Sequence, residues 1–391
     1  MDSLKASLLS SIDKERKGMV DLQKLLTPIV AMAPENGGTG EEKKAEALAK
    51  YLSAAGITEL ERLDAPDPRV PGGKRPNLIA TIRGESDERR FWIMSHLDVV
   101  PPGEMSLWKS DPFSVREEGD IIYGRGVEDN QQGLVSSVFA ALAFVKNGMR
   151  PKYTVKLLFI ADEEVGCLYG IQYLLKEHAD IFRKGDWVLV PDSGRPDSRM
   201  MEVAEKSILW LRFTTSGKQC HASMPYLGKN AFVAGSDLVL RLADLSARFN
   251  ETNPIFDPPY STFVPTKKEA NVPNVNTLPG EDAFCLDCRI LPSIKVNDVL
   301  SEIESRMKDV EKKYGVKISY SVLQRTESVP TPADAPFVTT LAGAIKEVYG
   351  TDPEPVGIGG GTVAAYLRNA GYDSVVWATI DESAHMPNEY C

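Results

Sequence analysis

The amino-acid sequence predicts an α/β protein in which a domain with a mixed β-sheet is interrupted by a second domain of a different kind. Apolar runs of strand length alternate with helical segments at both ends of the chain, which indicates a layered α/β domain. Between roughly residues 207 and 322 the order changes to β-α-β-β-α-β, the order of a ferredoxin-like unit. The 391 residues also exceed what one hydrophobic core usually organises.

The first part of the chain supplies most of the α/β domain. Composition and apolar spacing predict helices within residues 2–31 and 40–55, and a helix at about 131–147 that closes at Gly148. Strands are expected at 77–84 (NLIATIRG), 89–100 (RRFWIMSHLDVV) and 154–161 (TVKLLFIA). The third of these is apolar along its length, as is typical of a strand buried on both faces of a parallel sheet.

The alternation continues on both sides of the interruption. It predicts a helix at about 169–179, a strand at 187–190, a helix at 335–349 and a strand at 374–380. Because the sheet pattern resumes near the end of the chain, the second domain is inserted into the first rather than appended to it. The expected limits are residues 1–206 and 323–391 for the α/β domain and 207–322 for the inserted domain.

The inserted domain has its own sequence of elements. Strands are predicted at 207–217, 283–291 and 316–323, a helix at 230–248, and a turn at TLPGEDAFC between two extended segments. Apolar residues at spacings of three and four predict one buried face of a second helix: Val296, Val299, Leu300, Ile303, Met307, Val310 and Tyr314.

Bulk properties exclude several classes of partner. A formal charge of −10 and a pI of about 5.2 argue against nucleic-acid binding. No stretch approaches the roughly 20 apolar residues of a membrane span, and the N-terminus lacks the apolar core of a signal peptide. Five cysteines, an odd number without regular spacing, are typical of free thiols in a reducing compartment. We therefore expect a cytoplasmic protein with neither a nucleic-acid nor a membrane partner.

Acidic residues and histidines follow several of the predicted strands. In open α/β sheets, ligands bind outside the carboxyl ends of the strands. His96 and Asp98 stand two apart at the end of one strand, so that their side chains leave on the same side. That arrangement suits a metal-bound imidazole whose second nitrogen is oriented by a carboxylate. A lone H-x-D is nevertheless a weak signal.

Glu163 and Glu164 follow the most apolar strand, where uncompensated charge would be costly without a nearby cation. As neighbours in an extended segment they should diverge, so that one can bind a metal ion while the other acts as general base. Asp192 and His385 end other strands, and Asp129 follows a Gly-Arg-Gly turn. Together these residues approach the number of O and N donors that a pair of hydrolytic metal ions requires.

The motifs that carry these residues resemble the M20 metallopeptidase family, in the acetylornithine deacetylase and succinyl-diaminopimelate desuccinylase group. They are SHLDVVPPG, GRGVEDNQQG, FIADEEVG, PDSG, SGKQCHAS, NVNTLPG, DCRILP, GGGT and SAHMPNEY. They follow the order of the family over almost the whole chain. One departure is that glutamines follow Asp129 closely, where many members of the family have a lysine.

The resemblance implies a role for each residue of the predicted metal site. One zinc ion would be held by His96 and Asp192, a second by Glu164 and His385, and Asp129 would bridge both. Asp98 would orient His96, and Glu163 would be the general base. Co²⁺ or Mn²⁺ could replace zinc, because N and O ligands discriminate weakly between these ions. The inserted domain would then be the lid and dimerisation domain of a homodimer.

The resemblance also places substrate-binding residues in and near the lid. His221 corresponds to a histidine that donates to the tetrahedral oxyanion, often from the partner subunit. Arg289 could grip a substrate carboxylate, although a structural salt bridge to Asp287 is the alternative. Asn276 and the turn formed by Gly360, Gly361 and Thr362 stand at further substrate-binding positions of the family. These donors indicate a small-molecule substrate with a free carboxylate.

We expect a zinc-dependent hydrolase of N-acyl amino acids that acts through a metal-bridging hydroxide. An M20 dipeptidase or carboxypeptidase is the alternative, and a catalytically inactive relative that binds metal or peptide is a third possibility of a different class. A dinucleotide-dependent oxidoreductase is disfavoured, because G-x-G-x-x-G would require glycine at Asp129 or at Thr362.

Overall fold

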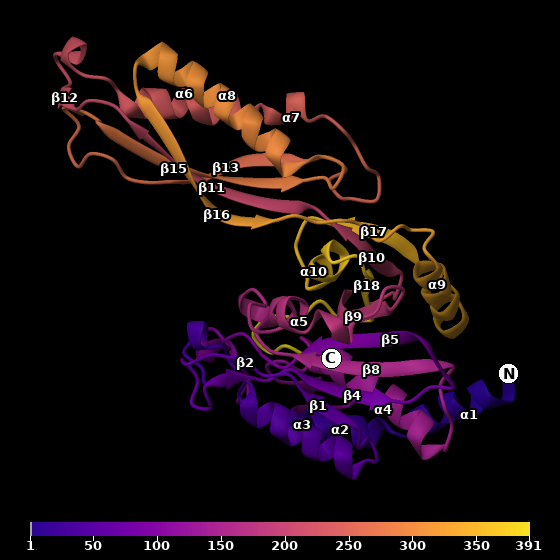
Figure 1. The fold of residues 1–391 in the computed structure, drawn as a ribbon. Helices are drawn as coiled ribbons and strands as arrows, with labels where there is room; N and C mark the ends of the chain where they lie inside the picture. Colours follow the sequence, from indigo (N-terminus) through magenta and orange to yellow (C-terminus); the bar gives the residue numbers. More distant parts are fainter. Residues whose placement is uncertain (1) are drawn as a thin grey trace. The chain divides into compact units, whose positions relative to one another are not determined.

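The computed structural model describes residues 2–391, which form two compact units (Figure 1). The first unit comprises the chain up to Val203 together with Thr331–Pro355 and Tyr366–Cys391, and the second comprises Ala204–Pro330 and Val356–Ala365. The second unit thus includes residues 356–365, which the sequence pattern assigned to the α/β domain. The predicted domains remain a prediction, because compactness does not test whether a segment folds independently.

An eight-stranded mixed sheet dominates the α/β part of the molecule and confirms the predicted mixed α/β fold. In spatial order its strands are β1 (Leu60–Arg62), β4 (Leu78–Ile82), β8 (Tyr153–Ile160), β5 (Ser86–His96), β9 (Trp187–Gly194), β18 (Asp373–Ala378), β10 (Met200–Glu205) and β17 (Glu354–Ile358). The pairs β8–β5, β5–β9 and β9–β18 are parallel, whereas β1–β4, β4–β8 and β10–β18 are antiparallel. The alternation in the sequence did not predict β10 or β17.

The helices of the first unit pack against this sheet or against one another. They are α1 (Asp2–Asp13), α2 (Arg16–Leu26), α3 (Glu42–Ala54), α4 (Gln131–Lys146), α5 (Ile171–Glu177) and α9 (Pro336–Tyr349), with α10 (Ala364–Asn369) at the boundary between the units. Leu22, Leu48 and Phe139 of α2, α3 and α4 lie in one fully buried cluster with Ala80 and Phe159 of the sheet. Burying apolar side chains of this size contributes roughly 1.5–3 kcal/mol each, so this layer fixes the position of α4 and of the loop before it.

The predicted helical region 2–31 is interrupted between α1 and α2. The break falls at Lys14–Glu15, within a run of charged residues that offers no apolar side chain to the core. In α2, a Cβ atom at Gly18 would lie 2.9 Å from the ring of Phe139, so the absence of a side chain allows close contact with α4.

The second unit contains a four-stranded antiparallel sheet in the order β13 (Thr262–Lys268), β15 (Glu281–Ile290), β11 (Ser207–Ser216) and β16 (Lys317–Thr326). The helices α6 (Ala231–Ala243) and α8 (Val296–Tyr314) pack side by side on one face of this sheet (Figure 1), and α7 (Leu245–Arg248) follows α6. Five of the seven residues predicted for the apolar face of α8 are buried, namely Val296, Val299, Ile303, Met307 and Val310, whereas Leu300 and Tyr314 are only partly buried.

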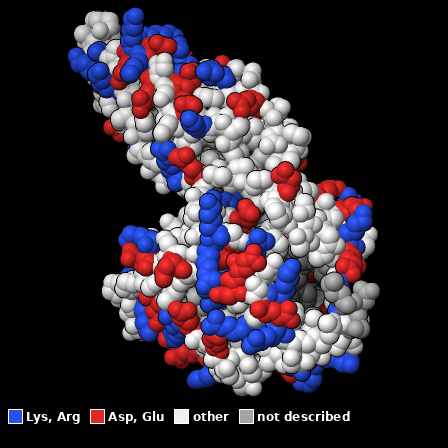
Figure 2. Space-filling view, turned by 45° about the vertical axis from the view of Figure 1, so that its right-hand side comes forward, with Lys and Arg blue, Asp and Glu red and all other residues white. Residues whose placement is uncertain are grey.

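Several short strand pairs complete the described chain. They are β2 (Ala65–Pro66) with β3 (Lys74–Arg75), β6 (Arg116–Glu118) with β7 (Ile121–Tyr123), and β12 (Cys220–His221) with β14 (Thr277–Leu278). Among the residues that the structure describes, none of the helices has the length and apolar character needed to cross a membrane. In the view of Figure 2, acidic and basic side chains are interspersed over much of the surface.

Candidate metal centre

Four neighbouring parallel strands of the sheet, β8, β5, β9 and β18, deliver four of the five predicted metal-binding residues to one edge, and Asp129 comes from the loop before α4. His96 is the last residue of β5 and pairs with Ile160, the last residue of β8. Asp192 lies near the end of β9, and His385 lies in the segment that follows β18. Parallel strands end at the same edge of a sheet, which is why residues almost 300 positions apart in the chain meet there.

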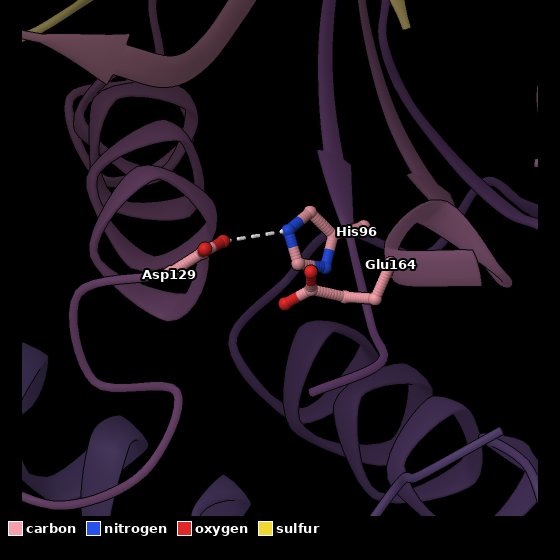
Figure 3. Close-up of side chains that lie close together, drawn as sticks. All are labelled: His96, Asp129 and Glu164. Atoms are coloured by element: carbon pink, nitrogen blue, oxygen red, sulfur yellow. Dashed lines mark hydrogen bonds and ion pairs between the residues drawn. The ribbon is translucent and has the colours of Figure 1, made fainter. Parts of the chain in front are cut away.

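Asp129 joins two sets of donors through its two carboxylate oxygens. Its Oδ1 lies 2.9 Å from Nε2 of His96, and its Oδ2 lies 3.1 Å from Nε2 of His385. The same nitrogen of His96 is 3.4 Å from Oδ1 of Asp192, and that of His385 is 3.1 Å from Oε2 of Glu164. Figure 3 shows His96, Asp129 and Glu164 converging from three separate segments. Two imidazole–carboxylate pairs therefore share one aspartate.

The donor set fits two divalent cations of the zinc type. Potential ligand atoms of His96, Asp129 and Glu164 lie within 4.8 Å of one another, and so do those of His96, Glu163 and Asp192. Oδ1 of Asp192 is buried without a hydrogen-bond partner. Carboxylates and neutral imidazoles are ligands that zinc accepts, and bound cations would offset the repulsion among the converging, partly buried acids.

The partly buried side chain of Glu163 has an unusual environment. Burial, followed by the negative charge of Asp192, raises the pKa of Glu163 well above its ordinary value. Burial likewise raises the pKa of Glu164, although its hydrogen bond with His385 opposes this shift. A raised pKa favours a carboxyl that can return a proton as well as accept one, which is consistent with the predicted role of Glu163 as general base.

Asp98 contacts His96 and the backbone of both glutamates, Glu163 and Glu164. Its carboxylate oxygens accept the backbone N–H groups of Glu163 and Glu164, each at 3.1 Å. Nδ1 of His96 lies 3.0 Å from the carbonyl oxygen of Asp98 and 3.4 Å from its Oδ1. Burial alone would raise the pKa of Asp98, but the bonds with His96 and with the two N–H groups lower it. Asp98 therefore stays ionised beside the imidazole.

The local conformation around the two glutamates differs from the expectation. Glu163 and Glu164 lie in a short 3₁₀ turn, η3 (Glu163–Val165), and not in an extended segment. Asp162, just before the turn, has a left-handed backbone with φ of 68°, and its carboxylate accepts the N–H of Tyr169. The side chains still diverge, but the turn and its bonds to Asp98 cause the divergence.

The two histidines differ in exposure. His96 is buried, whereas the side chain of His385 is 53% exposed and its backbone is left-handed, with φ of 63°. Hydrogen bonds with Asp129 and Glu164 raise the pKa of His385 to about 10. Burial opposes protonation of His96, yet its hydrogen bond with Asp129 and the nearby negative charge of Asp192 raise its pKa well above the ordinary value. The converging carboxylates that favour a proton on each imidazole would favour a bound cation in the same way.

Close packing places the loop that carries Asp129 beside Asp192. A Cβ atom at Gly133 would lie 2.2 Å from the carbonyl oxygen of Pro191, so α4 approaches β9 as closely as it does only with glycine there. The side-chain amide of Asn130 donates to the same carbonyl at 2.6 Å and accepts the N–H of His96 at 3.3 Å.

Sequence reasoning missed Asn130 and three further buried residues around the cluster, Arg125, Glu128 and Glu389. Each lies within four positions of a predicted ligand, in GRGVEDN or in HMPNEY. Their position inside these motifs was the available signal, since charged residues are seldom fully buried unless they have a partner.

The predicted oxyanion and substrate residues lie in the second unit. His221 is exposed in β12, where its Nδ1 lies 2.7 Å from Oγ of Ser223. The strand pair β12–β14 brings Asn276 close to it, because the carbonyl oxygen of Asn276 accepts the N–H of Ala222 at 2.9 Å. The structure therefore groups these two residues, and their approach to the metal-binding residues stays a prediction.

Arg289 is engaged in local contacts. Its guanidinium donates to both carboxylate oxygens of Asp287 at 2.8 and 3.1 Å, and to the carbonyl oxygen of Gly359 at 2.9 Å. In the adjoining Gly-rich turn, Oγ1 of Thr362 donates to Glu205 at 2.6 Å, and Gly361 lies near Ile208. Gly360 has ample room around its Cα. The salt bridge to Asp287, which was the alternative role for Arg289, is thus present. A role for Arg289 in substrate binding stays a prediction.

Comparison with known proteins gives a consistent family. The model of peptidase family M20/M25/M40 matches residues 92–391. An uncharacterized metallohydrolase of Methanococcus maripaludis is 38% identical over 396 residues, covering 95% of this chain and 94% of the relative. A succinyl-diaminopimelate desuccinylase of Paracoccus denitrificans is 29% identical over 341 residues, covering 87% and 84%. The crystal structure of aminopeptidase PepT from Bacillus cereus has a TM-score of 0.76 at 19% identity, covering 96% and 93%.

The similarity to PepT supports the fold alone, because so low an identity carries no information on substrate. The family match, in contrast, includes every predicted metal-binding residue, and the methanogen relative is similar over nearly the full length. The resemblance inferred from the motifs is confirmed. The chain therefore belongs to peptidase family M20/M25/M40 and is a metal-dependent hydrolase of amide bonds.

Proposed function

We propose that this hydrolase removes the acyl group from N-acyl amino acids, as a deacetylase or desuccinylase does. The observation that carries the proposal is the shared Asp129, whose two oxygens face two separate imidazole–carboxylate pairs beside the partly buried Glu163. The similarity to a desuccinylase over most of the chain supports this substrate class ahead of peptides.

Two zinc ions are the proposed cofactors, with Co²⁺ or Mn²⁺ as substitutes. His96 and Asp192 would hold one ion, Glu164 and His385 the other, and Asp129 would contribute one oxygen to each. Bound there, the ions supply Lewis acidity, which lowers the pKa of water and polarises an amide carbonyl.

Glu163 is the proposed general base. It would take a proton from the attacking water and return it to the nitrogen of the leaving amine, so that it ends each turnover in its starting state. Its raised pKa suits the second transfer, and the bonds from Asp98 to the 163–164 turn hold its backbone in place. Asp98 would also keep His96 oriented through Nδ1.

The second unit is proposed to act as the lid and as the dimerisation surface of a homodimer. His221 would donate to the oxyanion of the tetrahedral intermediate. Arg289, Asn276, Gly360, Gly361 and Thr362 would bind the free carboxylate of the substrate. The guanidinium of Arg289 would then have to exchange or share its contacts with Asp287 and Gly359.

A substrate panel tests the proposal. The zinc-loaded protein is incubated with N-acetylornithine, N-succinyl-diaminopimelate, other N-acyl amino acids and dipeptides, and the products are followed by mass spectrometry. Release of acetate or succinate supports the proposal, whereas cleavage confined to dipeptides would identify a dipeptidase or carboxypeptidase. A protein that binds two ions yet cleaves no member of the panel would be an inactive relative.

A further inference from the structure

Two buried glutamates join the loop that carries Asp129 to the segment that carries His385. Each glutamate lies in one of these segments and accepts hydrogen bonds from the other. Oε1 of Glu389 accepts the backbone N–H groups of Glu128 and Asp129, at 3.0 and 3.1 Å. Glu128 in turn accepts from the other segment: its Oε2 takes the N–H of Ser383 at 2.5 Å and its hydroxyl at 2.7 Å. Oε1 of Glu128 accepts the N–H of Asp381. We call this arrangement the reciprocal glutamate clamp.

A buried arginine completes the clamp. Arg125 donates to Oε2 of Glu389 at 2.5 Å and, through Nη2, to the carbonyl oxygen of His385 at 3.3 Å. The exposed fractions of Arg125, Glu128 and Glu389 are 2%, 4% and 0%. Burying charged groups is costly, and an ion pair often recovers little more than that cost. Stability alone therefore gives a weak reason for three charged residues here.

Backbone hydrogen bonds next to the clamp hold only part of the C-terminal segment. Ile122 and Cys391 exchange two backbone hydrogen bonds, at 3.0 and 3.1 Å, and the N–H of Gly124 donates to the carbonyl oxygen of Glu389 at 3.0 Å. This ladder aligns 122–124 with 389–391, but it stops short of His385, which lies in a bend with left-handed φ. Between the ladder and His385, the bend is held to the Asp129 loop by the glutamates and Arg125.

We propose that Glu128, Glu389 and Arg125 are positioning residues that fix the distance between Asp129 and His385, and so set the affinity of the metal position formed by Asp129, Glu164 and His385. The inference rests on the proposed two-ion site. None of the three residues is given a role in contact with substrate.

The clamp should act unequally on the two metal positions. His96 and Asp192 lie on β5 and β9, which the ladders of the sheet hold. Glu128 binds only the 381–383 part of the His385 segment, so its loss should move His385 and leave His96 and Asp192 in place. Glu389 binds the N–H of Asp129 itself, so its loss should affect both positions, because Asp129 is shared.

The test is a calorimetric titration of the metal-free full chain with Zn²⁺. For Glu128→Ala we expect one of the two binding steps to lose at least about ten-fold in affinity, with the other step changed by less than about three-fold, as for loss of a group that orients a ligand. Glu389→Gln should weaken both steps. Glu128→Gln, which keeps one acceptor oxygen, should recover part of the affinity and serves as the second variant if Glu128→Ala fails to fold.

Asp186→Ala is the matched control. Asp186 is also a buried carboxylate of the first unit; it accepts the N–H groups of Arg90 and Arg183, but it precedes β9, at the opposite end of that strand from Asp192. It should lower the melting temperature of the metal-free protein and leave both zinc affinities unchanged. The inference is overturned if Glu128→Ala and Glu128→Gln weaken both steps equally, or neither. Wild-type protein that binds fewer than two ions would overturn the proposed function itself.

Discussion

The residues assigned to metal binding and those assigned to substrate binding have opposite electrostatic surroundings. In the first unit, Asp129, Glu164 and Asp192 converge without a lysine or arginine partner for these carboxylates among the described residues, and their charges shift the pKa of both histidines upward. In the second unit, Arg289 already has a carboxylate partner, Asp287. Carboxylates that converge without a lysine or arginine partner indicate a site for a cation. The Arg289–Asp287 pair, whose charges already balance each other, gives no comparable indication of a ligand.

The substitution Glu163→Gln should have the largest effect on turnover, and it tests the metal-binding side of this comparison. The amide cannot take a proton from water, so turnover should fall by about 10²- to 10⁴-fold, while zinc binding stays near two ions per chain. Initial rates on the best substrate of the panel and metal analysis of the same sample measure the two quantities. Glu177→Gln, an exposed change on α5, is the control. Near-normal rates in Glu163→Gln would remove this residue from its assigned role.

His221→Ala tests the substrate-binding side. Loss of one donor to an oxyanion costs about 10²- to 10³-fold in kcat, so a similar fall is expected, with zinc affinity unchanged because His221 is in the other unit. Mixing inactive Glu163→Gln with His221→Ala would show whether the histidine acts across a dimer, since activity would then return in hybrid pairs. Unchanged kcat in His221→Ala would leave this histidine as a surface residue.

The pH dependence of zinc binding tests whether a metal ion displaces a proton from His385 in the first unit. The metal-free pKa of His385 is about 10, so this imidazole is protonated at pH 7 and must lose its proton to bind zinc. Zinc affinity should therefore rise with pH below that pKa, by about ten-fold per pH unit for each proton displaced. Calorimetry in two buffers of different ionisation enthalpy counts the protons released. His385→Ala should release fewer, and a wild-type count of zero would contradict the assignment.

The sequence was sufficient for the part of the site that lies at strand ends. His96, Asp98 and Asp192 could be found because each follows an apolar run, and parallel strands bring such positions together. The alternation of strands and helices likewise predicted the mixed sheet, although β10 and β17 were missed.

The partners of residues that act through long-range backbone contacts could not be predicted. The hydrogen bond between Glu389 and the N–H of Asp129 joins positions 260 apart, so the place of Glu389 inside a motif marks the residue but not the group that it contacts. The 3₁₀ turn at Glu163 was missed for a related reason, since the left-handed backbone of Asp162 before it is unusual for a residue other than glycine. Both features depend on tertiary packing.

The smallest expected effect concerns Arg289, for which sequence left two roles open and the structure shows a pair with Asp287. If Arg289 binds the substrate carboxylate, Arg289→Lys should raise KM by about ten-fold, because lysine cannot replace a bidentate fork, with kcat nearly unchanged. Asp287→Asn is the informative partner: it removes the competing carboxylate charge and should lower KM if Arg289 alternates between Asp287 and substrate. If both variants keep the wild-type KM and lose only thermal stability, Arg289 belongs to the structural pair, and the substrate carboxylate is bound elsewhere.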